Sequence, residues 1–120
     1  AYAKQNNLPV TLLKNADGNF IAPTGENFAA AAAGADWAKA PGMALSLNNQ
    51  PGANSWPITT ASFILMYKQP ADAGKSKEAL AFFDWAFKDG GKLADELDYV
   101  AMPSKATDYI RKSVWTQIKN

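Results

Sequence analysis

The segment from Trp56 to Tyr67, WPITTASFILMY, constrains the fold more than any other stretch of the chain. It ends in five consecutive apolar residues, and the polar stretch KQPADAGKS follows it. A continuous apolar run bounded by turn signals is typical of a strand that is buried on both faces. The segment therefore predicts a buried strand and, with the helical patterns around it, an α/β fold.

The first half of the chain predicts a hairpin, one short helix and a long loop. Asp17-Gly18 is a two-residue turn signal, so we expect a hairpin over residues 10–22. Thr24 is a good N-cap for an alanine-rich helix over residues 25–33, and Gly34 is a good C′ residue to end it. Residues 35–55 are rich in Pro, Gly and Asn and predict a loop with at most one helical turn near residues 37–39.

The second half predicts helices with an apolar face. Ser76 is expected to cap the helix KEALAFFDWAFKDGG, which Gly90 ends, and a shorter helix is expected over residues 92–98. Ser104 is expected to cap a last helix. Its apolar stripe is Ile110, Val114 and Ile118, and its solvent-facing residues are Arg111, Lys112 and Lys119.

Composition excludes several classes of function. The 120 residues contain no cysteine and no histidine, so disulfides, thiolate catalysis and Ser-His-Asp catalysis are excluded. Twelve basic and eleven acidic residues are spread evenly, which gives no basic stripe for nucleic acid. The sequence contains no run of about 18 apolar residues, so it predicts no segment that spans a membrane. We expect no cofactor and no metal site, because no loop of alternating acids is present.

The chain opens AYAKQNN, without Met and without the apolar region of a signal peptide. This opening looks like the end of a helix, so we expect further sequence upstream of Ala1.

Carboxylates are the only candidate acids and bases, and they form two clusters. One cluster contains Asp95, Glu96 and Asp98, and the other contains Asp84 and Asp89. Hydrolysis by a carboxylate pair requires facing groups at a cleft, one of them desolvated. Both clusters are predicted on solvent-facing helix surfaces, with Asp84 pairing with Lys88 at i,i+4, so we expect solubility and capping roles and no catalytic residue.

Three other features of the sequence are candidate binding sites. The hydroxyls of Thr59, Thr60 and Ser62 could bind an oxyanion, although ordinary bonding to the backbone is the simpler interpretation. Gly90-Gly91 reads as a helix stop and not as a phosphate loop. The aromatic side chains could stack on a base or a sugar, but a role in the core is the simpler expectation; they are Phe82, Phe83, Trp85 and Phe87.

Five motifs in series carry a resemblance to a known family. They are AYAKQNNL, NADGNFIAPTGENFAAAAAGADW, WPIT followed by FILMYK, FFDWAFKDG, and LDYVAMP. In this order and at these spacings, they resemble the periplasmic phosphate-binding proteins of phosphate-specific ABC transporters. The resemblance covers essentially all 120 residues and corresponds to the C-terminal two fifths of such a protein.

The resemblance implies a two-lobe, type II-like periplasmic binding protein with helices packed on a mixed sheet. Residues 1–55 would form the end of the second lobe, and residues 56–120 would form the return strand of the hinge and the C-terminal helices of the first lobe. Family members hold phosphate through main-chain NH groups, hydroxyls, an arginine and an aspartate in motifs that this chain lacks. No phosphate ligand is therefore assigned here, and Arg111 is not a candidate.

The function implied is capture of inorganic phosphate in the periplasm, together with the missing N-terminal part, for a membrane permease of the ABC transporter. This chain would supply scaffold and hinge. The alternative is a self-contained structural or interaction module with no small-molecule ligand. An enzyme is disfavoured because no nucleophile–base pair is present.

Overall fold

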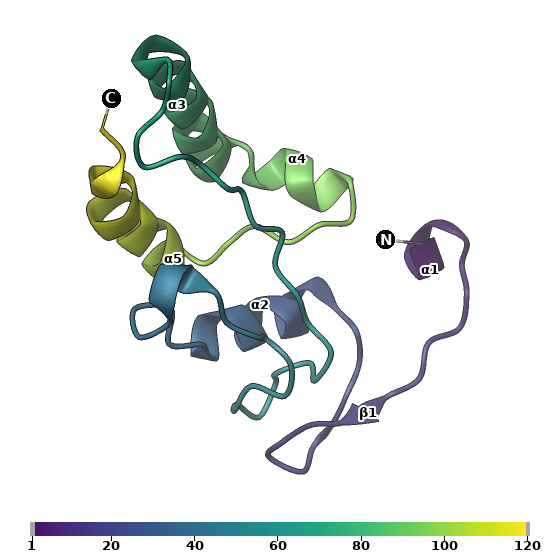
Figure 1. Cartoon of the computed structure of the whole chain (residues 1–120). Coiled ribbons are helices and arrows are strands. Elements are labelled where there is room, and N and C mark those ends of the chain that lie inside the picture. Colours follow the sequence, from purple (N-terminus) through teal and green to yellow (C-terminus); the bar gives the residue numbers. More distant parts are fainter. Residues whose placement is uncertain (1, 120) are drawn as a thin grey trace.

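The chain is mainly helical, with long extended connections and one small sheet (Figure 1). The computed structural model describes residues 2–119. In chain order the elements are α1 (Tyr2–Gln5), β1 (Leu13–Lys14), β2 (Phe20–Ile21), α2 (Gly25–Gly34), the 3₁₀ turn η1 (Pro41–Met43), α3 (Ala73–Asp89), α4 (Gly91–Glu96), α5 (Ser104–Tyr109), the π-helical turn η2 (Ile110–Val114) and the 3₁₀ turn η3 (Trp115–Gln117).

The predicted hairpin is confirmed, but it is short. β1 and β2 pair antiparallel, with Leu13 opposite Ile21 and Lys14 opposite Phe20. The connection is a three-residue loop in place of the two-residue turn expected, because the Asn15 N–H bonds to the Asn19 carbonyl. Gly18 has φ +87°, the left-handed conformation that a loop of this kind requires and that glycine adopts without strain.

Asn15 joins this hairpin to residues 52–55. Its side chain is buried, and Nδ2 donates to the carbonyls of Gly52, Ala53 and Ser55 at 3.0–3.3 Å. Its Oδ1 accepts from the N–H groups of Asp17 and Asn19. One amide therefore satisfies five polar groups in two separate segments.

Helix α2 begins as predicted and ends for a different reason. Thr24 is the N-cap, and its Oγ1 accepts from the Asn27 N–H at 3.3 Å. Gly34 is the last helical residue, not a left-handed C′ residue, and the extended Ala35 follows it. A Cβ at Gly34 would lie 3.0 Å from the Pro51 carbonyl oxygen, so glycine permits a close backbone approach.

The region predicted as a loop, residues 35–55, supplies much of the core. Trp37 is buried, and its indole N–H donates to the Ala32 carbonyl at 2.8 Å. Burying the indole with its polar group satisfied lets a segment without regular structure pack as core. The buried cluster is made of Ala32, Ala35, Trp37, Met43, Leu47 and Ala106.

The long helix α3 begins earlier than predicted. The N-cap is Asp72, whose Oδ1 accepts from the Lys75 N–H at 3.0 Å, so the prediction that Ser76 caps this helix was wrong. Ser76 lies within the first turns and is buried. The predicted end at Gly90 is confirmed, and α4 follows at once. A Cβ at Gly90 would lie 2.6 Å from the Ala86 carbonyl oxygen, which favours glycine at this corner.

The C-terminal helix is continuous in space but changes its hydrogen-bond pattern from α5 through η2 to η3. Pro103 occupies the N-cap position without a side-chain bond, so Ser104 is not the cap that the sequence predicted. Ile110 and Val114 pack against the core, which confirms that part of the predicted apolar stripe.

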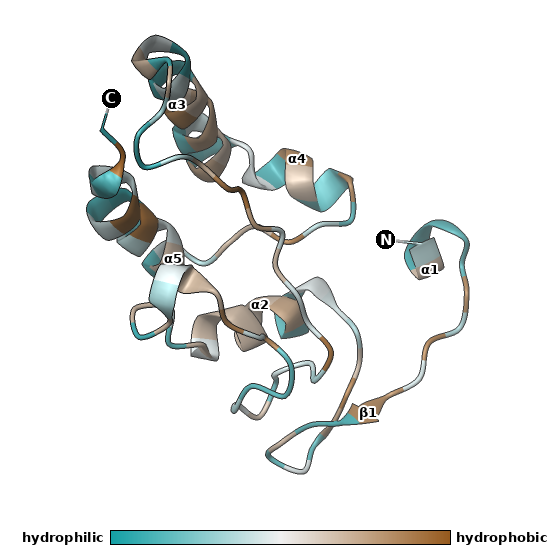
Figure 2. Cartoon of the chain, viewed as in Figure 1, coloured by the Kyte–Doolittle hydropathy of each residue, from teal (hydrophilic) through white to brown (hydrophobic). Residues whose placement is uncertain are grey.

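The prediction of a buried strand over the apolar run was wrong. Residues 59–67 are extended, without a strand assignment, and within residues 2–119 the only sheet is the β1–β2 pair. Leu65 is 93% exposed, and Phe63, Ile64 and Tyr67 are also exposed. Figure 2 shows hydrophobic colour along this extended connection. An extended run becomes a buried strand only when neighbouring strands pair with its edges and other elements cover its faces, and within residues 2–119 no strand pairs with residues 59–67.

The chain is less compact than its mass predicts. Its radius of gyration is 16.2 Å, whereas a compact domain of this length has about 13.6 Å. Its accessible surface is 8352 Å², whereas about 6,300 Å² is expected for 12.9 kDa. The excess surface is available for packing against further polypeptide.

Candidate functional site

The candidate site is the segment that leaves Trp56 and runs past α2 toward α3. Trp56 is buried, its N–H donates to the Asn27 carbonyl at 3.1 Å, and its ring meets Phe28 edge to face at 6.3 Å. The Asn49 N–H bonds to the Pro57 carbonyl at 2.8 Å. The start of the segment is therefore fixed to α2, while Ile58 and Thr60 are already exposed, and so are residues 62–65.

A cavity of about 450 Å³ lies beside this segment. Its walls come from α2, from the end of α3, from α4 and from the connection that follows α4. Most lining groups are apolar; they include Phe28, Ala32, Ile58, Phe87, Tyr99 and Met102. An apolar wall suits packing better than it suits an anion, which needs donors.

The three hydroxyls weighed as an oxyanion site do line this cavity. Thr59 Oγ1 donates to the Trp56 carbonyl at 3.1 Å, so this hydroxyl bonds to nearby backbone as the simpler interpretation expected. Thr60 and Ser62 are exposed to solvent. Gly90 and Gly91 form part of the same wall at the corner between α3 and α4. A dehydrated site with convergent donors is not formed by these groups.

The carboxylates do not form a facing pair. Asp95 and Glu96 are exposed on α4, while Asp98 pairs with Lys4. Asp89 is exposed at the end of α3, and Asp84 pairs with Arg111. Within residues 2–119, no group of three or more acids is arranged to hold a metal ion.

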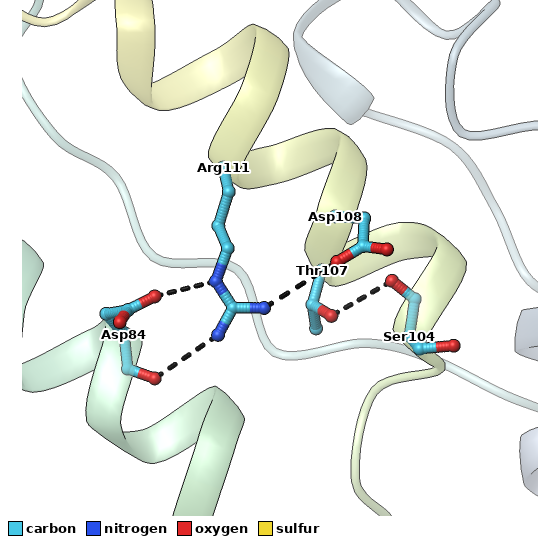
Figure 3. Close-up of polar contacts among 5 residues, drawn as sticks. All are labelled: Asp84, Ser104, Thr107, Asp108 and Arg111. Atoms are coloured by element: carbon cyan, nitrogen blue, oxygen red, sulfur yellow. Dashed lines mark hydrogen bonds and ion pairs between the residues drawn. The ribbon is translucent and has the colours of Figure 1, made fainter.

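Arg111 joins the C-terminal helix to α3, and Figure 3 shows this contact. Its Nε donates to Asp84 Oδ1 at 2.6 Å, and Asp108 Oδ1 lies 3.8 Å from its Nη1. The guanidinium carbon also lies 5.8 Å from the centre of the Phe87 ring. Arg111 is therefore partly covered and not free in solvent as expected, and Asp84 pairs with Arg111 in place of Lys88, although the Asp84 side chain remains 48% exposed.

The aromatic set on α3 divides between two faces. Phe83 and Phe87 face inward and line a second cavity of about 360 Å³, together with Trp37, Val114 and Trp115. Phe87 stacks on Trp115 with ring centres 5.7 Å apart. Phe82 and Trp85 are exposed, 5.8 Å apart, so the expectation of core positions was wrong for these two residues.

Lys4 and Asp98 form an ion pair between α1 and the residues that follow α4. Lys4 Nζ lies 2.5 Å from Asp98 Oδ1, and the Asp98 side chain is only 12% exposed. The hydrogen bond from Lys4 lowers the pKa of Asp98 below its ordinary value, and the same bond to Asp98 raises the pKa of Lys4. Local sequence patterns gave no sign of this contact.

Sequence reasoning also missed Asn15 and Trp37. Asn15 stands before Ala-Asp-Gly, so its position at a turn was visible, but its bonds to residues 52–55 depend on tertiary contacts. Trp37 stands in a stretch predicted as loop. A lone tryptophan there was a usable signal, because such a large apolar side chain is seldom left in solvent.

Together, these contacts define a class of protein segment. It is a helix-rich segment in which residues from Trp56 onward are anchored to α2 at their start, and its described residues contain no facing acid pair and no closed site with convergent donors. Among residues 2–119, no helix has the length and apolar character needed to cross a bilayer.

The particular relatives are phosphate-binding proteins. The chain is similar to the phosphate-binding protein PstS of Pasteurella multocida, with 46% identity over 120 residues, which is all of this chain and 35% of the relative. It is similar to PstS of Haemophilus influenzae, with 46% identity over 119 residues, 99% of this chain and 36% of the relative. It is also similar to PstS of Xylella fastidiosa, with 48% identity over 103 residues, which is 86% of this chain and 28% of the relative. No protein-family model matches the chain.

These similarities confirm the predicted resemblance to a C-terminal portion of a phosphate-binding protein. The chain spans about a third of the length of the curated relatives that it matches.

Proposed function

We propose that the chain is the C-terminal part of a periplasmic solute-binding component that captures inorganic phosphate for import by an ABC transporter. The observation that carries this proposal is the 46% identity to a phosphate-binding protein over all 120 residues. The relatives carry the name of a binding protein and not of an enzyme, which agrees with the lack of a nucleophile–base pair in the sequence.

In this proposal the whole protein has two lobes of the type II-like binding-protein class, with helices on a mixed sheet. Residues 1–55 belong to the end of the second lobe, and residues 56–120 supply the return strand and the C-terminal helices of the first lobe. The anchored start at Trp56 and the exposed apolar run after it support this division, because a return strand has one fixed end and needs partners along its length.

The groups that grip phosphate belong to the rest of the protein. The largely apolar wall of the 450 Å³ cavity and the local bond of Thr59 support this view. The chain then contributes scaffold and hinge, and a membrane permease of the transporter is the partner of the whole protein. Basic and acidic residues are nearly equal in number, so the charge gives no support for a nucleic-acid partner.

Complementation tests the proposal. The chain is mixed with the first two thirds or so of the Pasteurella multocida relative, and inorganic phosphate is titrated by calorimetry. We expect no saturable heat from the chain alone and saturable binding from the mixture. Saturable binding by the chain alone would contradict the scaffold role, and no binding by a mixture that forms a complex would contradict the proposed function. A chain with Trp56–Thr59 in scrambled order is the matched control and should fail to restore binding.

A self-contained interaction module remains the second candidate, favoured by the exposed apolar run at Phe63, Ile64, Leu65 and Tyr67. This candidate predicts a defined assembly of the chain by itself and no complex with the relative's remaining part. Sedimentation of the same mixture separates the two candidates.

A further inference from the structure

The end of α4 contains a residue that local physics does not favour. Tyr99 N–H bonds to the Ala94 carbonyl at 2.9 Å, and Asp98 N–H bonds to the Asp95 carbonyl at 3.1 Å. These two bonds make a Schellman motif with Asp98 at the C′ position, where φ is +61°. Glycine is the usual residue there, because a Cβ is strained in the left-handed region.

The charge of Asp98 is unfavourable as well. The C-terminal end of a helix carries partial negative charge, so a carboxylate there is repelled while a cation is attracted. Asp95 and Glu96 in the same turn add like charge. Backbone conformation and electrostatics therefore both oppose an aspartate at position 98. A residue that violates local rules in two ways usually has its reason in a distant contact.

That distant contact is Lys4, in the last turn of α1 (Figure 1). Its ammonium group lies 2.5 Å from Asp98 Oδ1. The Lys4 side chain is 76% exposed, whereas that of Asp98 is 12% exposed, so the lysine reaches from the outside onto a largely covered carboxylate. Helix α1 buries none of its described residues, and Gln5 in the same helix also hydrogen-bonds to the Asp98 side chain, so polar contacts to Asp98 tie α1 to the end of α4.

We infer that Asp98 and Lys4 form a latch that holds the segment before the crossing against the segment after it. Lys4 lies before Trp56 and Asp98 lies after it, so the pair closes the chain across the crossing segment. As a latch between lobes, the inference rests on the proposed function. As a tie between α1 and the end of α4, it rests on the contacts alone.

Amide hydrogen exchange of this chain, measured by NMR without phosphate, tests the latch. The probes are the amides of Asn6 and Leu8, which bond to Tyr2 and Ala3 carbonyls, and of Ala94 in α4. In Asp98→Gly, exchange at Asn6 and Leu8 should quicken roughly two- to five-fold. Exchange at Ala94 should stay equal or slow down, because glycine suits the C′ position. Lys4→Met should quicken the same two amides.

The matched control is Asp36→Asn, which removes the exposed Asp36–Lys39 pair and should leave α1 unchanged. Raising salt to about 0.5 M should quicken the α1 amides in the parent chain and not in Asp98→Gly. Unchanged exchange at Asn6 and Leu8 in Asp98→Gly would overturn the inference, as would loss of protection at Ala94. Because phosphate is absent, this result is independent of the test of the proposed function.

Discussion

Arg111 shows how one side chain can join two helices that the sequence treats as separate. It bonds to the Asp84 carboxylate and also lies over Phe87, so it contacts α3 through charge and through an aromatic face. Helix periodicity places Arg111 and Asp84 on solvent-facing surfaces. It shows which face of a helix is apolar, but it does not show which neighbouring helix contacts the polar residues beside that face.

The Arg111–Asp84 pair predicts a modest loss of stability on mutation. Asp84→Asn should lower the free energy of unfolding by about 0.5–1 kcal/mol, a small value because Asp84 is 48% and Arg111 30% exposed to screening solvent. Urea unfolding followed by circular dichroism measures it. Asp89→Asn, an exposed carboxylate on the same helix, should change almost nothing, and equal effects from both variants would contradict the role of the pair.

Asn15 predicts a larger effect at a single position. Asn15→Ala should lower the free energy of unfolding by about 2–3 kcal/mol, because it removes the side-chain partner of the Ser55 carbonyl and of the Asp17 and Asn19 N–H groups. Asn19→Ala is the matched control, since this exposed amide makes one side-chain bond of 3.3 Å and should cost less than about 0.5 kcal/mol. A smaller loss from Asn15→Ala than from Asn19→Ala would show that residues 52–55 are held by other contacts.

Capping residues illustrate what could be predicted locally. Thr24 was identified because it stands directly before an alanine-rich helix. The sequence predicts Ser76 as the cap of α3, because the polar stretch that precedes it resembles a loop, whereas the structure begins the helix one turn earlier at Asp72. A cap is predictable when the first turn already shows the pattern of the helix.

At the level of elements, the docking of α1 should depend on pH. The pKa of Asp98 is lowered, so its contribution is present above the unfolded pKa of about 3.9 and is lost as pH falls through the folded value. The pKa of Lys4 is raised, so its contribution is present below about 10.4 and is lost as pH rises through the folded value. The tie should therefore hold from about pH 4 to about pH 10.

Amide chemical shifts of Asn6 and Leu8 followed through an acid titration measure this dependence. They should move as Asp98 takes up its proton. In Asp98→Asn the acid transition at these amides should be absent, and an identical transition in that variant would assign the effect to another group.

The apolar run over residues 59–67 shows why the fold could be only partly predicted. The apolar pattern predicts a strand buried on both faces, but a strand forms only where neighbouring strands pair with it, and none does so among the described residues. The hairpin and α2 were predictable because their bonds are local. The packing of residues 35–55, the Asn15 bonds and the Lys4–Asp98 pair were not, because each joins residues far apart in sequence.

At the level of the whole molecule, the exposed surface decides the behaviour of the chain. It exceeds the value expected for this mass by about 2,000 Å². Part of that excess is apolar and lies along Phe63–Tyr67, a run that no described strand pairs with. Such a surface favours pairing with other polypeptide, either the rest of a larger protein or another copy.

The chain alone should therefore self-associate as its concentration rises, through this apolar run. Leu65→Lys should weaken the association in sedimentation velocity, because a charge on a 93%-exposed position repels a second copy. It should change the free energy of unfolding by no more than about 0.5 kcal/mol, since Leu65 has few contacts to lose. Ala71→Lys, in the exposed polar stretch before α3, is the matched control and should leave association as in the parent chain. A parent chain that stays monomeric at every concentration would mean that residues 63–67 are covered within the single chain in solution.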